Sequence, residues 1–166
     1  MSRSPTPEPA QAGQESVWDF PRPPALRPST EHITVTLGGV VICETDTSLQ
    51  VLETSHPPTY YLPRDAFRPG SLRQGPGHSF CEWKGVASYL DVIGGDQTAI
   101  RAGWWYPTPT AAFTDLARHV ALYPGAMDAC LVDGERVRAQ PGGFYGGWVT
   151  SRVSGPFKGV PGSQGW

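Results

Sequence analysis

The chain has 166 residues, enough for one domain with a buried core and short for two. Its 13 Lys and Arg residues against 15 Asp and Glu leave it nearly neutral, without the positive field typical of nucleic-acid or acidic-membrane binders. We therefore expect no nucleic acid and no membrane among its partners. Its 20 Gly and 18 Pro, with six each of Trp, Tyr and Phe, favour turn-rich β architecture over long helices.

The cysteines Cys43, Cys81 and Cys130 are widely spaced and form no Cys-x-x-Cys unit. This pattern predicts neither a disulfide framework nor a zinc site, so we expect no metal and no cofactor. The N-terminus lacks the apolar core of a signal peptide, and no apolar run is long enough to span a bilayer. We expect a soluble cytoplasmic protein.

Residues 1–30 are rich in proline and almost free of periodic apolar residues. Such a segment buries too little surface to offset its ordering entropy, so we expect a disordered or extended arm. Trp18 and Phe20 are the exceptions, and they are candidates to pin the arm onto the domain or onto a second subunit. The expected organisation is this arm, a β domain over residues 31–139, and an extension over residues 140–166.

From residue 32 the apolar residues alternate, and Gly38-Gly39 provides the first turn. The pattern predicts a three-stranded meander over residues 32–54. Residues 56–65 contain three prolines, which argue against a central strand and favour an extended connector. We expect Tyr60 and Tyr61 to project from that connector.

Residues 79–91 read as a β-hairpin with its turn at Lys84-Gly85, because Gly tolerates the positive φ of a two-residue turn. That register pairs Trp83 with Val86, and it places Cys81 on the core face and Tyr89 on the opposite face. A loop over residues 68–78 leads into the hairpin. A strand over residues 97–106 follows it and places Trp104 and Tyr106 on one face.

Residues 110–118 form the one expected helix, about two turns long, with Thr110 at its N-cap. Asp133-Gly134 is a strong signal for a second hairpin. Residues 140–166 are dominated by Gly, Pro and single aromatic residues. We expect this extension to wrap the same domain, with its rings as anchors.

Several runs in chain order resemble the domain-of-unknown-function 427 family, DUF427, over roughly residues 33–133. The runs are Gly38-Gly39-Val40-Val41, Leu52-Glu53-Thr54, His56-Pro57-Pro58-Thr59-Tyr60-Tyr61-Leu62-Pro63, Cys81-Glu82-Trp83-Lys84-Gly85, Trp104-Trp105-Tyr106-Pro107 and Val120-Ala121-Leu122-Tyr123-Pro124. The resemblance implies an all-β fold of small bent antiparallel sheets, described as β-tent-like, and no established activity.

The chain departs from that family at Glu82, where Pro is common, and its tail resembles an extension seen in a subset of members. The family also carries a nucleotidyltransferase tag. This sequence has neither a Gly-rich phosphate loop before a helix nor a close Asp pair for Mg²⁺.

The main functional hypothesis is an aromatic-lined pocket for a small organic ligand. Rings can form a cage for a flat ring or a cation, and Glu53, His56 and Arg64 are the expected polar anchors; the alternative is that the rings form only core. The expected ligand-binding residues are Tyr60, Tyr61, Arg64, Trp83, Lys84, Tyr89, Trp104 and Tyr106.

Two alternatives use other residues. In the first, a hydrolase- or transferase-type enzyme employs Glu53 and His56 in acid–base roles, or Cys81 as a nucleophile beside Lys84. In the second, the chain is an interaction module that forms a homo-oligomer through the N-terminal arm or the C-terminal tail.

Overall fold

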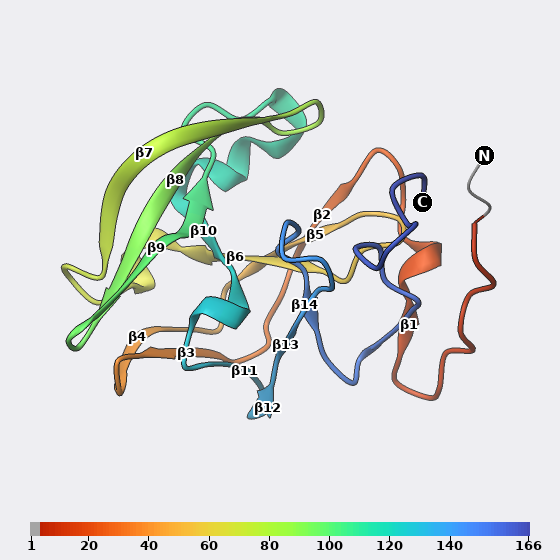
Figure 1. Ribbon diagram of the computed structural model, residues 1–166, viewed down its shortest axis with the longest axis horizontal. Helices are drawn as coiled ribbons and strands as arrows, with labels where there is room; N and C mark the ends of the chain where they lie inside the picture. Colours follow the sequence, from red (N-terminus) through yellow and green to blue (C-terminus); the bar gives the residue numbers. More distant parts are fainter. Residues whose placement is uncertain (1–3) are drawn as a thin grey trace.

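The computed structural model describes residues 4–166, and it confirms the all-β fold with small antiparallel sheets (Figure 1). The largest sheet has seven strands in the order β2-β5-β6-β10-β9-β8-β7. In that order the strands are Ala25–Pro28, Leu49–Leu52, Thr59–Pro63, His119–Leu122, Gln97–Trp105, Gly85–Gly94 and Leu72–Cys81. The long strands β7 to β9 curve strongly at one end of the molecule (Figure 1).

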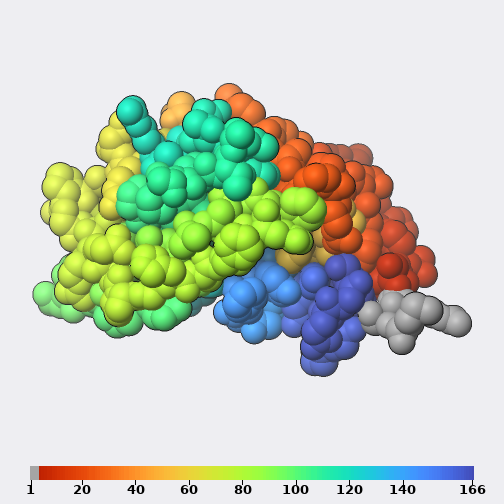
Figure 2. Space-filling model, turned by 90° about the horizontal axis from the view of Figure 1, so that it is seen from above, coloured from red at the N-terminus to blue at the C-terminus, as the bar shows by residue number. Residues whose placement is uncertain are grey.

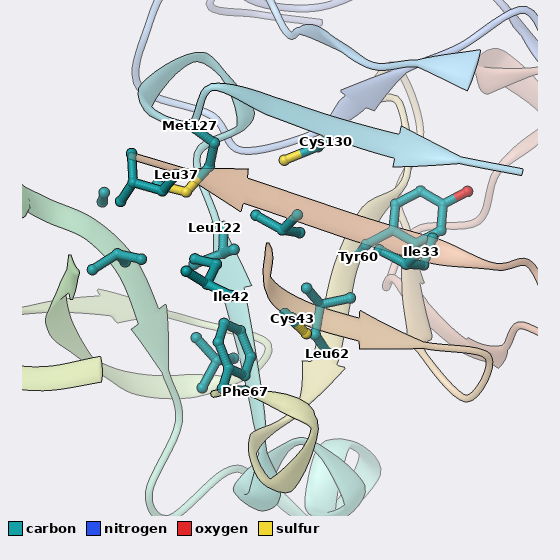
Figure 3. Close-up of a cluster of buried hydrophobic side chains, with 14 of the residues drawn as sticks. Ile33, Leu37, Ile42, Cys43, Tyr60, Leu62, Phe67, Leu122, Met127 and Cys130 are labelled. Carbon is teal, nitrogen blue, oxygen red and sulfur yellow. The ribbon is translucent and has the colours of Figure 1, made fainter. Parts of the chain in front are cut away.

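A second sheet has four strands in the order β12-β11-β3-β4. These are Glu135–Arg136, Ala129–Val132, Ile33–Leu37 and Val40–Thr45. Strand β3 alternates between buried and half-buried residues, so Ile33, Val35 and Leu37 share its inner face. They pack against Leu62 and Leu122 of the seven-stranded sheet, and this main core lies between the two sheets (Figure 3).

The opposite face of the seven-stranded sheet is also covered, by a second cluster that includes Tyr61, Trp104 and Tyr106. The cover includes η3, Ala111–Arg118, which buries Phe113 and Leu116. This is the expected helix, but it is 3₁₀ in type and kinked at Phe113, and Thr110 makes no side-chain cap. Shorter 3₁₀ turns are η1 Val17–Asp19, η2 Arg64–Ala66 and η4 Pro124–Ala126.

Within residues 4–166, no helix combines the length and the hydropathy that a membrane crossing requires.

The segment expected as an arm contributes strands to the fold. β2 forms the edge of the seven-stranded sheet by pairing with β5, and β1, Glu15–Ser16, pairs in parallel with β15, Val153–Ser154. Val17 and Phe20 pack with Leu52 and Val153 in a third cluster. Strand β2 lies before residue 30, so part of the expected arm belongs to the largest sheet. Residues 1–3 of the expected arm lie outside the described part of the chain.

The expected connector over residues 56–65 is instead the site of a central strand, β6, which lies between β5 and β10. The prolines permit this because Pro57 and Pro58 precede the strand and Pro63 is its last residue. The prediction of a three-stranded meander over residues 32–54 is also wrong, because β4 pairs with β3, whereas β5 pairs with β6 in the other sheet.

The hairpin over residues 79–91 forms with a different register. Cys81 pairs with Gly85 and Phe80 with Val86, so residues 82–84 make the turn. Gly85 has φ 107° but begins strand β8 instead of lying in a two-residue turn. Cys81 therefore lies on the face of Tyr89, while Phe80 and Val86 are 77% and 47% exposed on the outer face.

The loop expected over residues 68–78 is mostly strand β7, whose register shifts between Gln74 and His78. The Asp133-Gly134 turn is present as expected and joins β11 to β12. In the extension, β14, Trp148–Val149, pairs with β13, Arg138–Ala139, which directly precedes the extension. Figure 2 shows the extension in blue beside the red N-terminal segment and the green strands.

Candidate functional site

A cavity of about 580 Å³ opens on the second face of the seven-stranded sheet. Part of its floor is a row of directly paired residues: Tyr61 opposite Ala121, Ala121 opposite Trp104, and Trp104 opposite Tyr89. Directly paired residues point to the same side of a sheet, so the three rings face one space. The small Ala121 side chain separates Tyr61 from Trp104.

Contacts between the rings fix this floor. The Trp104 Nε1–H donates a hydrogen bond to Tyr61 Oη over 3.3 Å, and the Tyr61 and Tyr106 ring centroids are 6.3 Å apart. The Tyr123 ring lies 4.7 Å from that of Trp104. Burial raises the pKa of the Tyr61 and Tyr106 phenols, so both stay protonated at neutral pH and can donate hydrogen bonds.

One wall carries a histidine whose two ring nitrogens are both engaged. His56 Nε2 lies 3.5 Å from Glu53 Oε2, and His56 Nδ1 lies 2.9 Å from Gln140 Nε2. The Gly147 N–H donates to Gln140 Oε1, which orients the amide so that its NH₂ group faces the imidazole. Nδ1 is therefore the acceptor, and the proton of the neutral ring is on Nε2, facing Glu53.

The surroundings of His56 favour its neutral form. Burial lowers its pKa to about 4, and the charge of Lys158 acts in the same direction. A general base needs a free nitrogen within hydrogen-bond reach of the substrate proton. In this arrangement Nδ1, the unprotonated nitrogen of His56, already accepts from Gln140, so the ring holds the wall together.

Two lysines reach the same cavity. Lys84 comes from the turn between β7 and β8, and its Nζ lies 5.8 Å from the centroid of the Tyr106 ring. Lys158 comes from the extension; its Nζ lies 5.7 Å from the Tyr145 ring and donates to the Trp166 carbonyl over 3.3 Å. Both ammonium groups are held beside aromatic faces.

The C-terminal extension forms the remaining wall. Gly146 is buried so closely against Trp104 that any Cβ would collide with the indole ring. The Tyr123 hydroxyl donates to the Phe144 carbonyl over 3.0 Å, and the Tyr145 ring lies edge-on to His56 at 4.8 Å. The cavity therefore combines the central sheet with a segment distant in sequence.

The cavity brings together all the candidate residues except Tyr60 and Arg64. Neighbouring residues on a strand face opposite ways, so Tyr60 enters the main core and donates its hydroxyl to Glu31 over 2.7 Å. The Arg64 guanidinium lies 4.4 Å from the Trp105 ring, outside the cavity. The expected residues that line it are Glu53, His56, Tyr61, Cys81, Trp83, Lys84, Tyr89, Trp104 and Tyr106.

Several other residues line the cavity that the sequence patterns do not indicate as site residues. They include Ser79, Tyr123, Gln140, Phe144, Tyr145 and Lys158. For Phe144 and Tyr145, the only indication in the sequence was the expectation that the rings of the extension anchor it to the domain. Nothing in the local sequence links Gln140 or Lys158 to His56, since long-range packing makes these contacts.

Cys81 is half-buried at the cavity wall, whereas Cys43 and Cys130 lie in the main core. Burial raises the pKa of both core thiols to about 12, so they are inert at neutral pH. Within residues 4–166, no three His, Cys, Asp or Glu side chains gather closely enough to hold a metal ion.

Comparison with known proteins identifies one family. The family model for a domain of unknown function, DUF427, matches residues 25–133. Its first residue is also the first residue of β2, which agrees with the placement of that strand in the sheet. None of the curated proteins matches the chain.

Proposed function

The chain belongs to the DUF427 family, whose description assigns no activity, and we propose from the site itself that it binds a small organic molecule with a flat ring. The observation that supports this is the cavity of about 580 Å³, lined by aromatic rings on fixed strands and a few polar groups. Small-molecule sites typically have volumes of roughly 300–1,000 Å³ and this kind of lining.

The floor suits a planar ligand because its rings are already held in place. Tyr61 and Trp104 are joined by a hydrogen bond, and both lie on strands buried on two faces of the sheet. A preformed wall loses little conformational entropy when a ligand binds. Flat apolar ligands gain contact area against such rings, and offset or edge-on ring pairs add specificity.

The polar groups lie at the edges of this floor. Protonated phenols of Tyr61 and Tyr106 can donate hydrogen bonds, and the Glu53 carboxylate can accept them. A ligand with a ring and polar substituents would match this distribution. An enzymatic role draws less support, because His56 is engaged on both nitrogens.

A fragment screen with a matched pair of variants tests the proposal. Ser79 lies on the cavity side of β7, and its Oγ accepts from the Tyr89 hydroxyl over 3.1 Å. His78 precedes it on the same strand and is exposed outside the cavity. We expect Ser79→Trp to fill the cavity and His78→Trp to leave it open.

The measurement is two-dimensional amide NMR of the full chain with a library of acidic, neutral and basic aromatic fragments. We expect some fragments to shift the resonances of cavity residues in the native protein and in His78→Trp, but not in Ser79→Trp. The proposal fails if no fragment shifts those resonances, or if the same shifts persist in Ser79→Trp.

A further inference from the structure

The cavity is lined by both lysines of the chain, Lys84 and Lys158, and by none of the arginines within residues 4–166. A lysine ammonium is a compact point charge with several donors, whereas an arginine is a planar fork. The two lysines are far apart in sequence, and they line one cavity because the extension forms one of its walls. This concentration of one residue type in one cavity calls for a chemical explanation.

We propose that the cavity takes an aromatic acid, with its carboxylate or phosphate bound by Lys84 and Lys158 and its ring on the Tyr61–Trp104 floor. The inference rests on the proposed function and names the chemical class of its ligand.

Lys84 carries a charge that no ion pair occupies. Among the described residues it forms no ion pair; its Nζ lies over the Tyr106 ring face, and Tyr61, Cys81 and Glu53 are near enough to favour its charge. Burial opposes its charge, but Tyr61, Cys81 and Glu53 more than offset burial, so the pKa of Lys84 is raised. Lys84 is therefore charged at neutral pH, and a carboxylate or phosphate in the cavity could form a charge-assisted contact with it.

The carboxylates of the cavity do not fill this role. Glu53 faces His56 Nε2 at 3.5 Å, and Glu82 is exposed in the turn over residues 82–84. Lys158, Lys84 and Arg22 each lower the pKa of His56 in addition to burial, so these three cations act on the imidazole at this wall.

A cationic ligand fits less well. An aromatic cage attracts cations through its ring faces, but Lys84 already lies over Tyr106 and Lys158 over Tyr145. A second cation would meet two like charges in a partly desolvated space. Covalent capture of a carbonyl by Lys84 is also disfavoured, because an ammonium with a raised pKa is a poor nucleophile.

The test uses probes of equal shape and different charge with the full chain. Indole-3-acetate, indole-3-acetamide and tryptamine are titrated calorimetrically, and phenylacetate and phenyl phosphate are compared to distinguish carboxylate from phosphate. We expect indole-3-acetate to bind at least about tenfold more tightly than the amide, the scale of one charge-assisted contact. Tryptamine should bind most weakly.

Variants assign the preference to the lysine. Lys84→Met should weaken indole-3-acetate and leave the amide unchanged, and Lys84→Met combined with Lys158→Met should reduce the acid to the affinity of the amide, whereas Lys84→Arg should keep a preference for the acid. Arg64→Met is the matched control, because it also removes a cation from an aromatic face, at Trp105 outside the cavity. It should leave every probe's affinity unchanged.

The outcomes separate this inference from the proposed function. If the amide or tryptamine binds as tightly as the acid, or if the folded double variant lacking both lysines keeps the preference, the acid assignment is wrong and the cavity remains a ligand site. If the acids do not bind while neutral fragments still shift cavity resonances, the acid assignment is likewise wrong and the cavity remains a ligand site. If neither the probes nor the fragments bind, the proposed function itself falls.

Discussion

At the scale of single residues, the cavity wall depends on a neutral histidine. Gln140 Nε2 donates both to His56 Nδ1 and to the Lys158 carbonyl, over 2.9 and 2.8 Å. Its Oε1 accepts from the Gly147 N–H. This one side chain therefore connects His56, which precedes β6, to the extension. A buried amide with all these bonds satisfied rigidifies its surroundings.

This arrangement predicts a pH dependence of stability. The folded-state pKa of His56 is lowered from 6.5 to about 4. Between pH 6.5 and pH 4, the imidazole is therefore protonated in the unfolded chain and neutral in the folded chain. Stability is then complete above about pH 6.5 and falls as the pH drops towards 4. The pKa difference corresponds to roughly 3 kcal/mol in total, and to about 1 kcal/mol between pH 7 and 5.5.

Urea denaturation at pH 7 and at pH 5.5 checks this prediction, with His56→Gln as the control that cannot titrate. The native protein should lose about 1 kcal/mol more than the variant over this interval. Equal losses would contradict it. The groups that face His56 in the cavity are Glu53, Lys84, Gln140, Tyr145 and Lys158, with Arg22 acting at longer range.

At the scale of elements, the two sheets meet where two turns touch through their backbones. Gly38 lies in the β3–β4 turn and Gly94 ends β8. A Cβ at Gly94 would collide with the Leu37 carbonyl, and one at Gly38 would collide with the Gly94 carbonyl. This contact fixes how the four-stranded sheet is placed against the curved end of the seven-stranded sheet.

We therefore expect Gly94→Ala to destabilise the protein by about 1–3 kcal/mol, because the methyl group must push backbone apart. Gly125→Ala is the matched control, since its Cβ would meet only the Ala139 Cβ at 3.6 Å. That change should stay within about 0.5 kcal/mol of the native protein. Free energies of unfolding from urea titration compare the two; similar values would rule out the backbone contact.

At the scale of the whole molecule, the N-terminal segment from residue 4 onwards and the C-terminal extension are both built into the fold. Trp148 of the extension is fully buried in the main core, where its Nε1–H donates to the Leu122 carbonyl over 3.2 Å. Trp18 near the N-terminus and Trp166 at the C-terminus lie with ring centroids 5.7 Å apart. The family-matched segment alone thus lacks part of its own core.

The two tryptophans of the extension give a direct comparison. Trp148→Ala should destabilise the protein by roughly 3–5 kcal/mol, because it removes a buried indole and leaves the Leu122 carbonyl unpaired. Trp166→Ala should cost clearly less, because Trp166 is only half-buried. Urea unfolding of both variants measures the difference. Equal losses would show that the extension is not part of the core.

The sequence by itself determined the fold class and most of the candidate residues. Alternating apolar residues and frequent turn residues specify β-strands, and the strong turn at Asp133-Gly134 formed as predicted. Most of the expected pocket residues do line one cavity, because aromatic side chains next to each other on paired strands share a face. These are local properties, which a sequence carries directly.

Only the tertiary structure decided which strands are neighbours and which side of each strand faces the cavity. In the sequence, Pro63 argues against a central strand. In the structure it is the last residue of β6, where it removes no essential hydrogen bond. A register shift moved Cys81 to the cavity face, since a change of one residue reverses every side chain. Gln140 and Lys158 joined the site through contacts far apart in the chain, which no local pattern encodes.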